Sequence, residues 1–205
     1  MSNIIIPTSY IPSVAYMSLL MRHRDAIVEV CETFPKQTYR NRAEILTSNG
    51  ILRLSVPVVR TNGNHTLTRN IGISYAERWN VQHVRAIESA YNASPYFMYL
   101  WDGLNDILMR KHDRLLDLNE EVLVYLIKIL GVEVCLRKSE DYQEDVGDKN
   151  DYRNMFAHGN GEVNMPSYYQ VWGERYGFCA NLSVIDLIFN IGPAESKEYL
   201  EKLNW

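Results

Sequence analysis

Three cations gather in one short segment of the sequence, residues 36–42. The segment reads Lys-Gln-Thr-Tyr-Arg-Asn-Arg and contains no acid, although the net charge of the whole chain is −4. Arginine side chains form planar forks that bind phosphate or carboxylate groups through paired hydrogen bonds. The segment therefore predicts an anion-binding site, whose candidate ligand-binding residues are Lys36, Gln37, Tyr39, Arg40, Asn41 and Arg42. The alternative is a solvent-facing strand edge whose charges discourage the addition of another strand.

His83 is the candidate catalytic residue. It lies four residues after Trp79 and eight before Tyr91, so the three side chains share one face of a predicted helix. Partial burial on that face would keep the imidazole neutral near pH 7, as a general base requires. A core-edge histidine bonded to a backbone carbonyl is the alternative.

Three polar residues lie at the start of another predicted helix: Asn181, Ser183 and Asp186. Side-chain oxygens at a helix start cap free amides, and an acid in the first turn complements the helix dipole. Capping alone therefore explains these residues. Because the helix follows an aromatic segment and could face a cleft, Asn181 is also a candidate ligand-binding residue.

The familiar catalytic signatures are missing from the sequence. It contains no glycine-rich phosphate loop, no Gly-x-Ser-x-Gly, no His-Glu-x-x-His and no Cys-x-x-Cys, and its five histidines stand singly. We therefore expect no metal site and no cofactor.

Composition narrows the choice of partners and compartment. The chain has 21 basic and 25 acidic residues, so no global charge attracts nucleic acid or an anionic membrane. Its apolar runs are far shorter than the roughly 20 residues of a membrane span, and its amino terminus does not resemble a secretory signal. Cys31, Cys135 and Cys179 lack metal-ligand spacing and are expected to be free thiols. These features predict a cytoplasmic protein, and they leave its oligomeric state open.

The apolar patterns predict a mixed α/β fold. Asn3–Ile6 and Ala26–Val30 are typical of buried strands, and the helix between them, capped by Ser13, indicates a parallel pair. Asn49-Gly50 predicts a hairpin through a type I′ turn, with Ile51–Val58 as its second strand.

The apolar period then changes from two to about 3.6 residues. Trp79–Gly131 should form three helices, of which the second opens at Ser94-Pro95 and the third is capped by Asp117. The other expected elements are a short strand at Ile71–Ile73, a strand at Val132–Leu136, a solvated acidic loop at Ser139–Asp151, a strand-like segment at Met165–Trp172, and C-terminal helices that begin after Ser183 and break at Gly192-Pro193.

Several blocks follow one another across nearly the whole chain: Tyr10-Ile11-Pro12, residues 36–42, Leu54–Val58, Trp79–Tyr91, Ser94–Phe97 and Asn181–Asn190. With these blocks the chain resembles the WbqC-like family of bacterial proteins. Members of this family occur among O-antigen and surface-polysaccharide genes, so the resemblance implies a context and supplies no reaction. Tyr10, in the first block, joins the ligand-binding candidates. Members commonly have Gln-Pro where this chain has Ile6-Pro7, which puts a polar role for that position in doubt.

Residues 1–205 are therefore expected to form one WbqC-like domain, either undivided or built from a strand-rich half, 1–75, with a helical insertion, 76–131. We expect it to bind an anionic small molecule such as a nucleotide-sugar between residues 36–42 and the His83 helix. If it is an enzyme of surface-polysaccharide sugar modification, His83 would be the base.

In that site Arg40 and Arg42 would hold the anion, while Tyr39 and Asn181 would orient the ligand. Two other functions are open. One is a nucleotidyltransferase-like enzyme with an altered site, because the chain starts as strand, loop, helix and strand. The other is a non-catalytic module that binds another protein.

Overall fold

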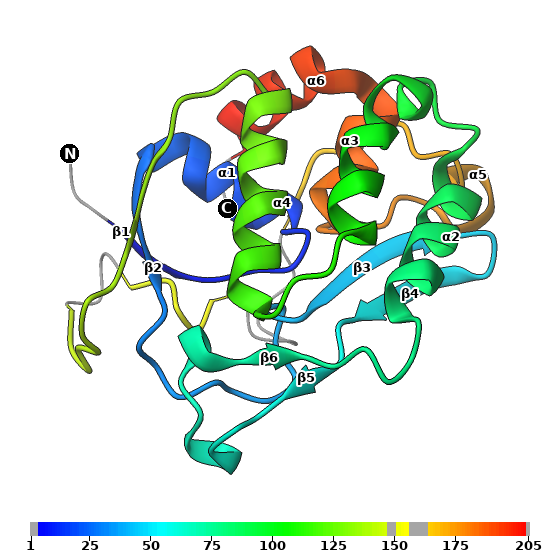
Figure 1. Ribbon diagram of the computed structural model, residues 1–205. Coiled ribbons are helices and arrows are strands. Elements are labelled where there is room, and N and C mark those ends of the chain that lie inside the picture. Colours follow the sequence, from blue (N-terminus) through cyan, green and yellow to red (C-terminus); the bar gives the residue numbers. More distant parts are fainter. Residues whose placement is uncertain (1–3, 147–150, 156–163, 204–205) are drawn as a thin grey trace.

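The computed structural model describes residues 4–146, 151–155 and 164–203 and has the predicted mixed α/β fold (Figure 1). Three parallel strands form its main sheet in the order β1 (Ile4–Pro7), β2 (Asp25–Glu29) and β7 (Cys135–Lys138). Ile4 pairs with Ala26, and Asp25 pairs with Cys135. The predicted parallel strand pair is thus confirmed.

Helix α1 (Val14–His23) connects β1 to β2. The Ser13 side chain accepts a hydrogen bond from the Tyr16 amide and caps this helix, as predicted. The predicted start of β7 at Val132 is wrong by three residues. β7 is the edge strand of this sheet among the described residues, and its Cys135 is exposed.

An antiparallel hairpin consists of β3 (Arg42–Thr47) and β4 (Gly50–Ser55), in which Thr47 pairs with Gly50. The hairpin is where the sequence predicts it, but the turn is not type I′. That turn needs positive φ at both central residues. Because Thr47 pairs with Gly50, the central residues are Ser48 and Asn49, and neither has a positive φ; the positive φ of +95° belongs to Gly50, the first residue of β4. In this turn the Thr47 hydroxyl oxygen accepts a hydrogen bond from the Asn49 backbone N–H.

A second, shorter antiparallel pair consists of β5 (Val58–Val59) and β6 (Gly72–Ile73), with the single-turn helices η1 (Gly63–His65) and η2 (Thr68–Asn70) between them. The strand expected at Ile71–Ile73 is therefore present.

Three helices follow, as predicted: α2 (Trp79–Tyr91), α3 (Phe97–Met109) and α4 (Leu115–Ile129). The expected cap of α4 is wrong, because Arg114 occupies the N-cap and Asp117 lies in the first turn. An acid there still complements the helix dipole.

The segment Met165–Trp172 does not form the expected strand. The Gln170 side chain connects this segment to Cys179, since its amide group donates to the Cys179 carbonyl oxygen and accepts from the Cys179 N–H. Of the predicted acidic loop, residues 139–146 contain neither helix nor strand, and residues 147–150 lie outside the described part.

The C-terminal part contains α5 (Gly173–Tyr176) and α6 (Val184–Lys202). Helix α6 breaks at Gly192, as predicted, where φ is +83°. A Cβ atom at this position would lie 2.6 Å from the Tyr96 ring, so both the backbone angle and the close approach require glycine.

One apolar core joins these elements, and its buried members run from Ile4 in β1 to Leu203 after α6. Residues of the suggested insertion, 76–131, belong to the same core as residues of the strand-rich half. The interpretation of the chain as one domain stays a prediction that this packing supports. None of the helices in the described residues is long and apolar enough to span a membrane.

Candidate functional site: a cavity at the carboxyl ends of the parallel strands

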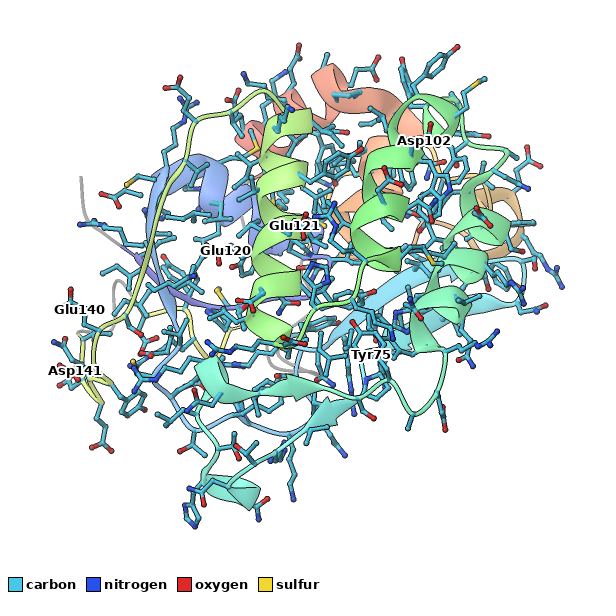
Figure 2. All side chains as sticks on the ribbon, in the orientation of Figure 1. Tyr75, Asp102, Glu120, Glu121, Glu140 and Asp141 are labelled. Atoms are coloured by element: carbon cyan, nitrogen blue, oxygen red, sulfur yellow. The ribbon has the colours of Figure 1, made fainter. Side chains whose placement is uncertain are left out.

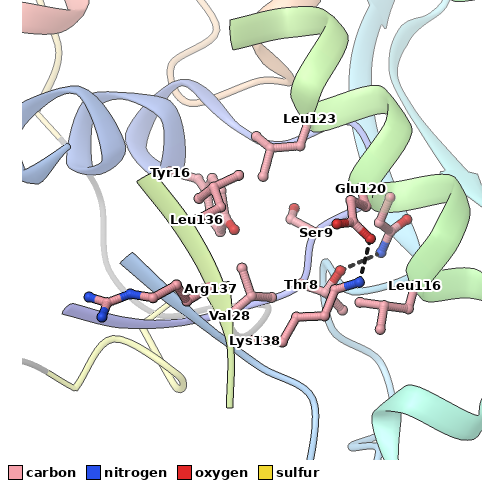
Figure 3. A pocket seen from close by; sticks show the side chains of 11 residues that line it. Thr8, Ser9, Tyr16, Val28, Leu116, Glu120, Leu123, Leu136, Arg137 and Lys138 are labelled. Carbon is pink, nitrogen blue, oxygen red and sulfur yellow. Dashed lines mark hydrogen bonds and ion pairs between the residues drawn. The ribbon is translucent and has the colours of Figure 1, made fainter. Parts of the chain in front are cut away.

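A cavity of about 260 Å³ lies at the carboxyl ends of the parallel strands, between the sheet and helices α1 and α4 (Figure 3). Its apolar lining comes from Val28, Leu116, Leu123 and Leu136, and its polar lining comes from Thr8, Ser9, Tyr16, Asn119, Glu120, Arg137 and Lys138. In α/β proteins, ligands commonly bind outside the carboxyl ends of parallel strands. Both its place and its mixed lining make this cavity the candidate site.

Two polar side chains in the cavity wall are bonded to each other. The Asn119 amide nitrogen donates to the Thr8 hydroxyl oxygen, 3.0 Å away, and to the Arg40 carbonyl oxygen, 2.8 Å away. Asn119 is 1% exposed, and its Oδ1 atom has no hydrogen-bond partner among the described residues. A buried acceptor without a donor is costly, so this atom has the capacity to accept one more hydrogen bond.

The mouth of the cavity carries charged side chains. Lys138 Nζ lies 2.7 Å from a Glu120 carboxylate oxygen, and both side chains are about half exposed. The Arg137 side chain points away from Lys138 (Figure 3) and forms an ion pair at 2.8 Å with Asp25, at the amino end of β2. Exposed ion pairs contribute little to stability, so Lys138 can exchange Glu120 for a ligand anion at low cost.

A second cavity, of about 310 Å³, shares Arg137 and Lys138 with the first. It lies against the other face of the sheet, where Ile5 and Ile27 contribute to its lining. Glu140 and Asp141 also line it, and they lie at the edge of the molecule, away from Glu120 on α4 (Figure 2). The first cavity is the better candidate, because acids contribute more of the wall of the second.

Arg40, predicted to hold an anion, is 2% exposed and already bonded to an acid of the chain. Its Nε and Nη2 atoms donate to the two carboxylate oxygens of Glu32, at 2.6 and 2.9 Å, and Nη2 also donates to the Arg153 carbonyl oxygen. Burial raises the pKa of Glu32, although Arg40 opposes this shift. The planar fork that the sequence predicts for a ligand thus binds Glu32.

Arg153 extends this buried cluster. It pairs with Asp151, at a distance of 2.5 Å, and with Glu29 at 3.4 Å. Hydrogen bonds from Arg153 hold the pKa of Asp151 below its usual value. The cluster of Glu29, Glu32, Arg40, Asp151 and Arg153 therefore satisfies most of its charges internally.

The other residues of segment 36–42 are dispersed. Lys36 and Gln37 are exposed, whereas the Tyr39 hydroxyl donates to Glu44 at 2.9 Å and the Asn41 amide donates to the Val56 carbonyl oxygen. Arg42 differs from Arg40, because its Nε atom is buried and has no hydrogen-bond partner among the described residues.

His83 is 6% exposed, and its Nδ1 atom lies 2.9 Å from the Tyr10 hydroxyl. The backbone of Ser55 also hydrogen-bonds to the ring. Burial lowers the pKa of His83 to about 4, so the imidazole is neutral at pH 7. The neutral state suits a base, yet these internal partners favour the interpretation as a core-edge histidine.

Tyr10 is hydrogen-bonded to two other residues that the sequence suggested for the site, Tyr39 and His83. Its amide donates to the Tyr39 carbonyl oxygen at 3.0 Å, and its hydroxyl meets His83. Burial raises the pKa of Tyr10 far above its usual value, so the phenol stays neutral. Tyr10, Tyr39, Arg42 and His83 thus surround the open end of the β3–β4 hairpin, where Arg42 pairs with Ser55.

Asn181 caps a helix, but not the one that it precedes. Its Oδ1 atom accepts the Ala15 amide at 3.0 Å, at the start of α1. Asn181 adopts a positive φ of +54°, which asparagine tolerates better than most residues. The expected cap of α6 by Asn181 is therefore wrong, and the Ser183 hydroxyl makes no cap hydrogen bond either.

Asp186 is a buried acid whose partners the sequence does not reveal. It is 1% exposed and accepts hydrogen bonds from Tyr91, Tyr168 and Gln170, at 2.9, 2.7 and 2.7 Å. Burial raises its pKa, although the three donors oppose this shift. Asp186 holds α6 to α2 and to the segment before α5.

The cavity residues Thr8, Asn119 and Lys138 are not among the candidates predicted from the sequence. One signal was available for Asn119, because it falls between Leu115 and Val122 at helical spacing and so interrupts the apolar face of α4. Thr8 directly follows a buried strand, and Lys138 ends another. Their convergence depends on the order of strands that are more than 100 residues apart in the sequence, which no local pattern reveals.

Comparison with known proteins agrees with the resemblance seen in the sequence blocks. Over 226 aligned residues the chain is 29% identical to "Uncharacterized protein Rv1507c" of Mycobacterium tuberculosis (strain ATCC 25618 / H37Rv), and the alignment covers 96% of each chain. No solved structure matches. The model of the WbqC-like protein family matches residues 8–158, which include α1, α4 and the parallel strands β2 and β7 but not β1. The chain belongs to the WbqC-like protein family.

Proposed function

We propose that this protein binds an anionic, hydroxylated small molecule such as a nucleotide-sugar in the cavity at the carboxyl ends of β1, β2 and β7. The observation that carries the proposal is the composition of the wall, where hydroxyl and amide groups of Thr8, Ser9 and Asn119 face apolar side chains and Lys138 stands at the mouth. Sugar rings offer both hydroxyl groups and apolar C–H faces, so this wall matches them.

The cavity is large enough to hold part of such a ligand. Its 260 Å³ is close to the lower limit, about 300 Å³, of typical small-molecule pockets. One ring fits this volume, and the remainder of a nucleotide-sugar would extend past the mouth. Lys138 would then lie beside the phosphate groups.

The residues that the sequence suggested for the site have different roles in this proposal. Arg40 supports the wall of the cavity, because its carbonyl group holds Asn119. The Nε–H group of Arg42 has no hydrogen-bond acceptor among the described residues and can still donate to a ligand. His83 is a proposed base only for a ligand that reaches the buried Tyr10 hydroxyl, to which its Nδ1 atom is bonded. If the protein is an enzyme, modification of a sugar for surface polysaccharides is the setting that the family suggests.

A nucleotidyltransferase-like site is less favoured. Such a site would use the free amides at the start of α1 to bind phosphate. The amides of Val14, Ala15 and Tyr16 already donate to the Leu182 carbonyl, the Asn181 side chain and the Ser13 side chain, respectively.

A thermal-shift screen with nucleotides and nucleotide-sugars tests the proposal. A ligand at 100 times its dissociation constant stabilises the folded state by about 2.7 kcal/mol, which raises Tm by about 5–10 °C for a chain of this length. We expect such a shift with at least one nucleotide-sugar, and mass spectrometry of the purified protein should find a retained metabolite of this class. A protein-interaction module would give no shift with any of them, and that result would contradict the proposal.

A further inference from the structure

The ion pair at the mouth of the cavity joins two side chains that have only each other. Lys138 Nζ donates to Glu120 Oε2 at 2.7 Å, and neither side chain forms another hydrogen bond or ion pair within the described residues (Figure 3). The buried carboxylate of Glu32 is held more firmly, because it accepts two hydrogen bonds from Arg40 and one from Thr68. One hydrogen bond thus holds Glu120, whereas three hold Glu32.

The release of Glu120 from Lys138 would bury no charge. The two side chains are 47% and 48% exposed, respectively, so a carboxylate that leaves Lys138 moves into water. An exposed ion pair of this kind contributes little to stability. A competing anion therefore has to overcome only a small free energy to take the place of Glu120.

The backbone on both sides of this ion pair is fixed. Lys138 lies in β7, where it pairs with Val28 of β2. Asn119, which precedes Glu120 in α4, is 1% exposed and donates two hydrogen bonds from its side chain. Because the backbone is held, the exchange of Glu120 for another anion requires only a rotation of its side chain.

The groups beside Glu120 determine what can replace it. The Lys138 ammonium group has three hydrogens to donate and accepts none. The Thr8 hydroxyl oxygen accepts from Asn119, and its own hydrogen has no acceptor within the described residues. Thr8 and Lys138 bond to consecutive residues of α4, so both donors lie beside the same helical turn. A group that replaces Glu120 must accept hydrogen bonds and carry negative charge, as a phosphate does.

We propose that Glu120 is a specificity-determining residue of the cavity: its carboxylate occupies the anion position at Lys138 in the free protein, and the phosphate end of the ligand displaces it. This inference rests on the proposed function and adds a residue that opposes binding. A neutral group gains nothing at Lys138 while Glu120 is there. A diphosphate carries more negative charge than one carboxylate, so Lys138 attracts it more strongly.

The test measures the affinities for UDP and for uridine by isothermal titration calorimetry. The wild-type protein should bind UDP about tenfold or more tightly than uridine, because only UDP carries phosphate. Glu120→Gln keeps the size of the side chain and removes its charge. It should tighten the binding of UDP about threefold, the scale of one exposed ion pair, and leave the affinity for uridine unchanged. Lys138→Gln should abolish most of the preference for UDP.

Asp117→Asn is the matched control. Asp117 is an exposed acid in the first turn of the same helix and does not line the cavity. Its replacement removes the same charge from α4 and should leave both affinities unchanged. Urea denaturation should give the same midpoint for Glu120→Gln as for the wild type, because the ion pair is exposed. An equal gain in both variants would show a general effect of charge and would overturn the inference.

Two other results of the titrations would also overturn it. If Glu120→Gln weakens the binding of UDP as Lys138→Gln does, Glu120 positions Lys138 for the ligand and does not compete with it. If Glu120→Gln leaves the affinity for UDP unchanged, the phosphate does not take the place of Glu120. In either case binding of UDP to the wild-type protein still supports the proposed function. If the wild type binds neither UDP nor any nucleotide-sugar, both proposals fail.

A crystal structure of the wild-type protein with UDP needs no variant. It should show a phosphate oxygen within hydrogen-bond distance of Lys138 Nζ and the Glu120 carboxylate turned towards solvent. UDP in the cavity with the bond between Lys138 and Glu120 intact would contradict the displacement and leave the proposed function standing.

Discussion

The buried Arg40–Glu32 pair and the cavity at the carboxyl ends of the strands lie next to each other, yet they differ in what their polar groups leave unused. Two nitrogen atoms of the Arg40 guanidinium group donate hydrogen bonds to Glu32, and one of them also donates to the Arg153 carbonyl oxygen. In the cavity wall, Thr8 keeps a hydrogen to donate and Asn119 keeps a free acceptor. Residues that look best suited to bind a ligand can therefore be the ones that build its site.

The largest effect that separates the two regions should come from Arg40→Leu. This change leaves the Glu32 carboxylate buried without its partner, which costs about 3–5 kcal/mol in the free energy of unfolding. Urea denaturation at pH 8 measures it, and Arg53→Leu, which breaks a more exposed pair with Glu44, should cost less than about 1 kcal/mol.

The loss in Arg40→Leu should also depend on pH. Burial already raises the pKa of Glu32, and removal of Arg40 raises it further. The carboxyl group of the variant then protonates as the pH falls, so the buried charge disappears and the loss at pH 5 should be smaller than at pH 8. A variant with wild-type stability at both pH values and weaker ligand binding would instead identify Arg40 as a ligand-binding residue.

His83 should give the next largest effect. Its pKa is lowered from 6.5 to about 4 by burial, so the folded state binds a proton less readily than the unfolded state does. The stability from neutral His83 is fully present above pH 6.5 and is lost as the pH falls towards 4, by about 3 kcal/mol. Unfolding of the wild-type protein and of His83→Gln between pH 7 and 4 should show this component only in the wild type.

The same variant tests the proposed base. If His83 is a core histidine, His83→Gln changes stability and leaves ligand affinity and any turnover as they are. Loss of turnover with unchanged affinity and stability would show that His83 acts in catalysis.

A smaller effect, this time on binding, is expected for Lys138→Gln. The change removes the cation at the cavity mouth and should weaken binding of a nucleotide-sugar about tenfold, while the free energy of unfolding changes by less than about 1 kcal/mol. Calorimetric titration and urea denaturation measure the two quantities. Lys202→Gln, which breaks the exposed pair with Glu198, is the control and should change neither.

Arg42→Lys should have the smallest effect. The change keeps the charge and removes the planar fork, and Arg42 lines neither of the two cavities described above. We expect stability within about 0.5 kcal/mol and ligand affinity within about twofold of the wild type. If binding weakens by about 1–3 kcal/mol instead, Arg42 grips the anion and the site lies at the hairpin.

Much of the fold could be predicted because its signals are local. The hairpin and the three helices differ in apolar period, and Ser13 caps α1 as its sequence suggests. The segment Met165–Trp172 has the aromatic composition of a strand, but it is held by side-chain hydrogen bonds such as those of Gln170 to the Cys179 backbone, which no local pattern reveals.

The candidate site was harder to predict, since its pairing is long-range. The sequence shows that residue 40 is an arginine, but it does not show the hydrogen bond from Arg40 to the Arg153 carbonyl oxygen, which joins residues 113 positions apart. Asn119 meets Thr8 across 111 positions. Residue type suggests what chemistry is available, and only the fold shows which groups are already used.

Hydrogen–deuterium exchange with and without a bound nucleotide-sugar tests most directly where the ligand binds. If it occupies the cavity, amides of the loop after β1, of α4 and of β7 should exchange more slowly in the complex, while those of residues 36–42 and α2 should not change. Slower exchange confined to residues 36–42 and α2 would place the ligand between Arg42 and His83 and would contradict a site in the cavity.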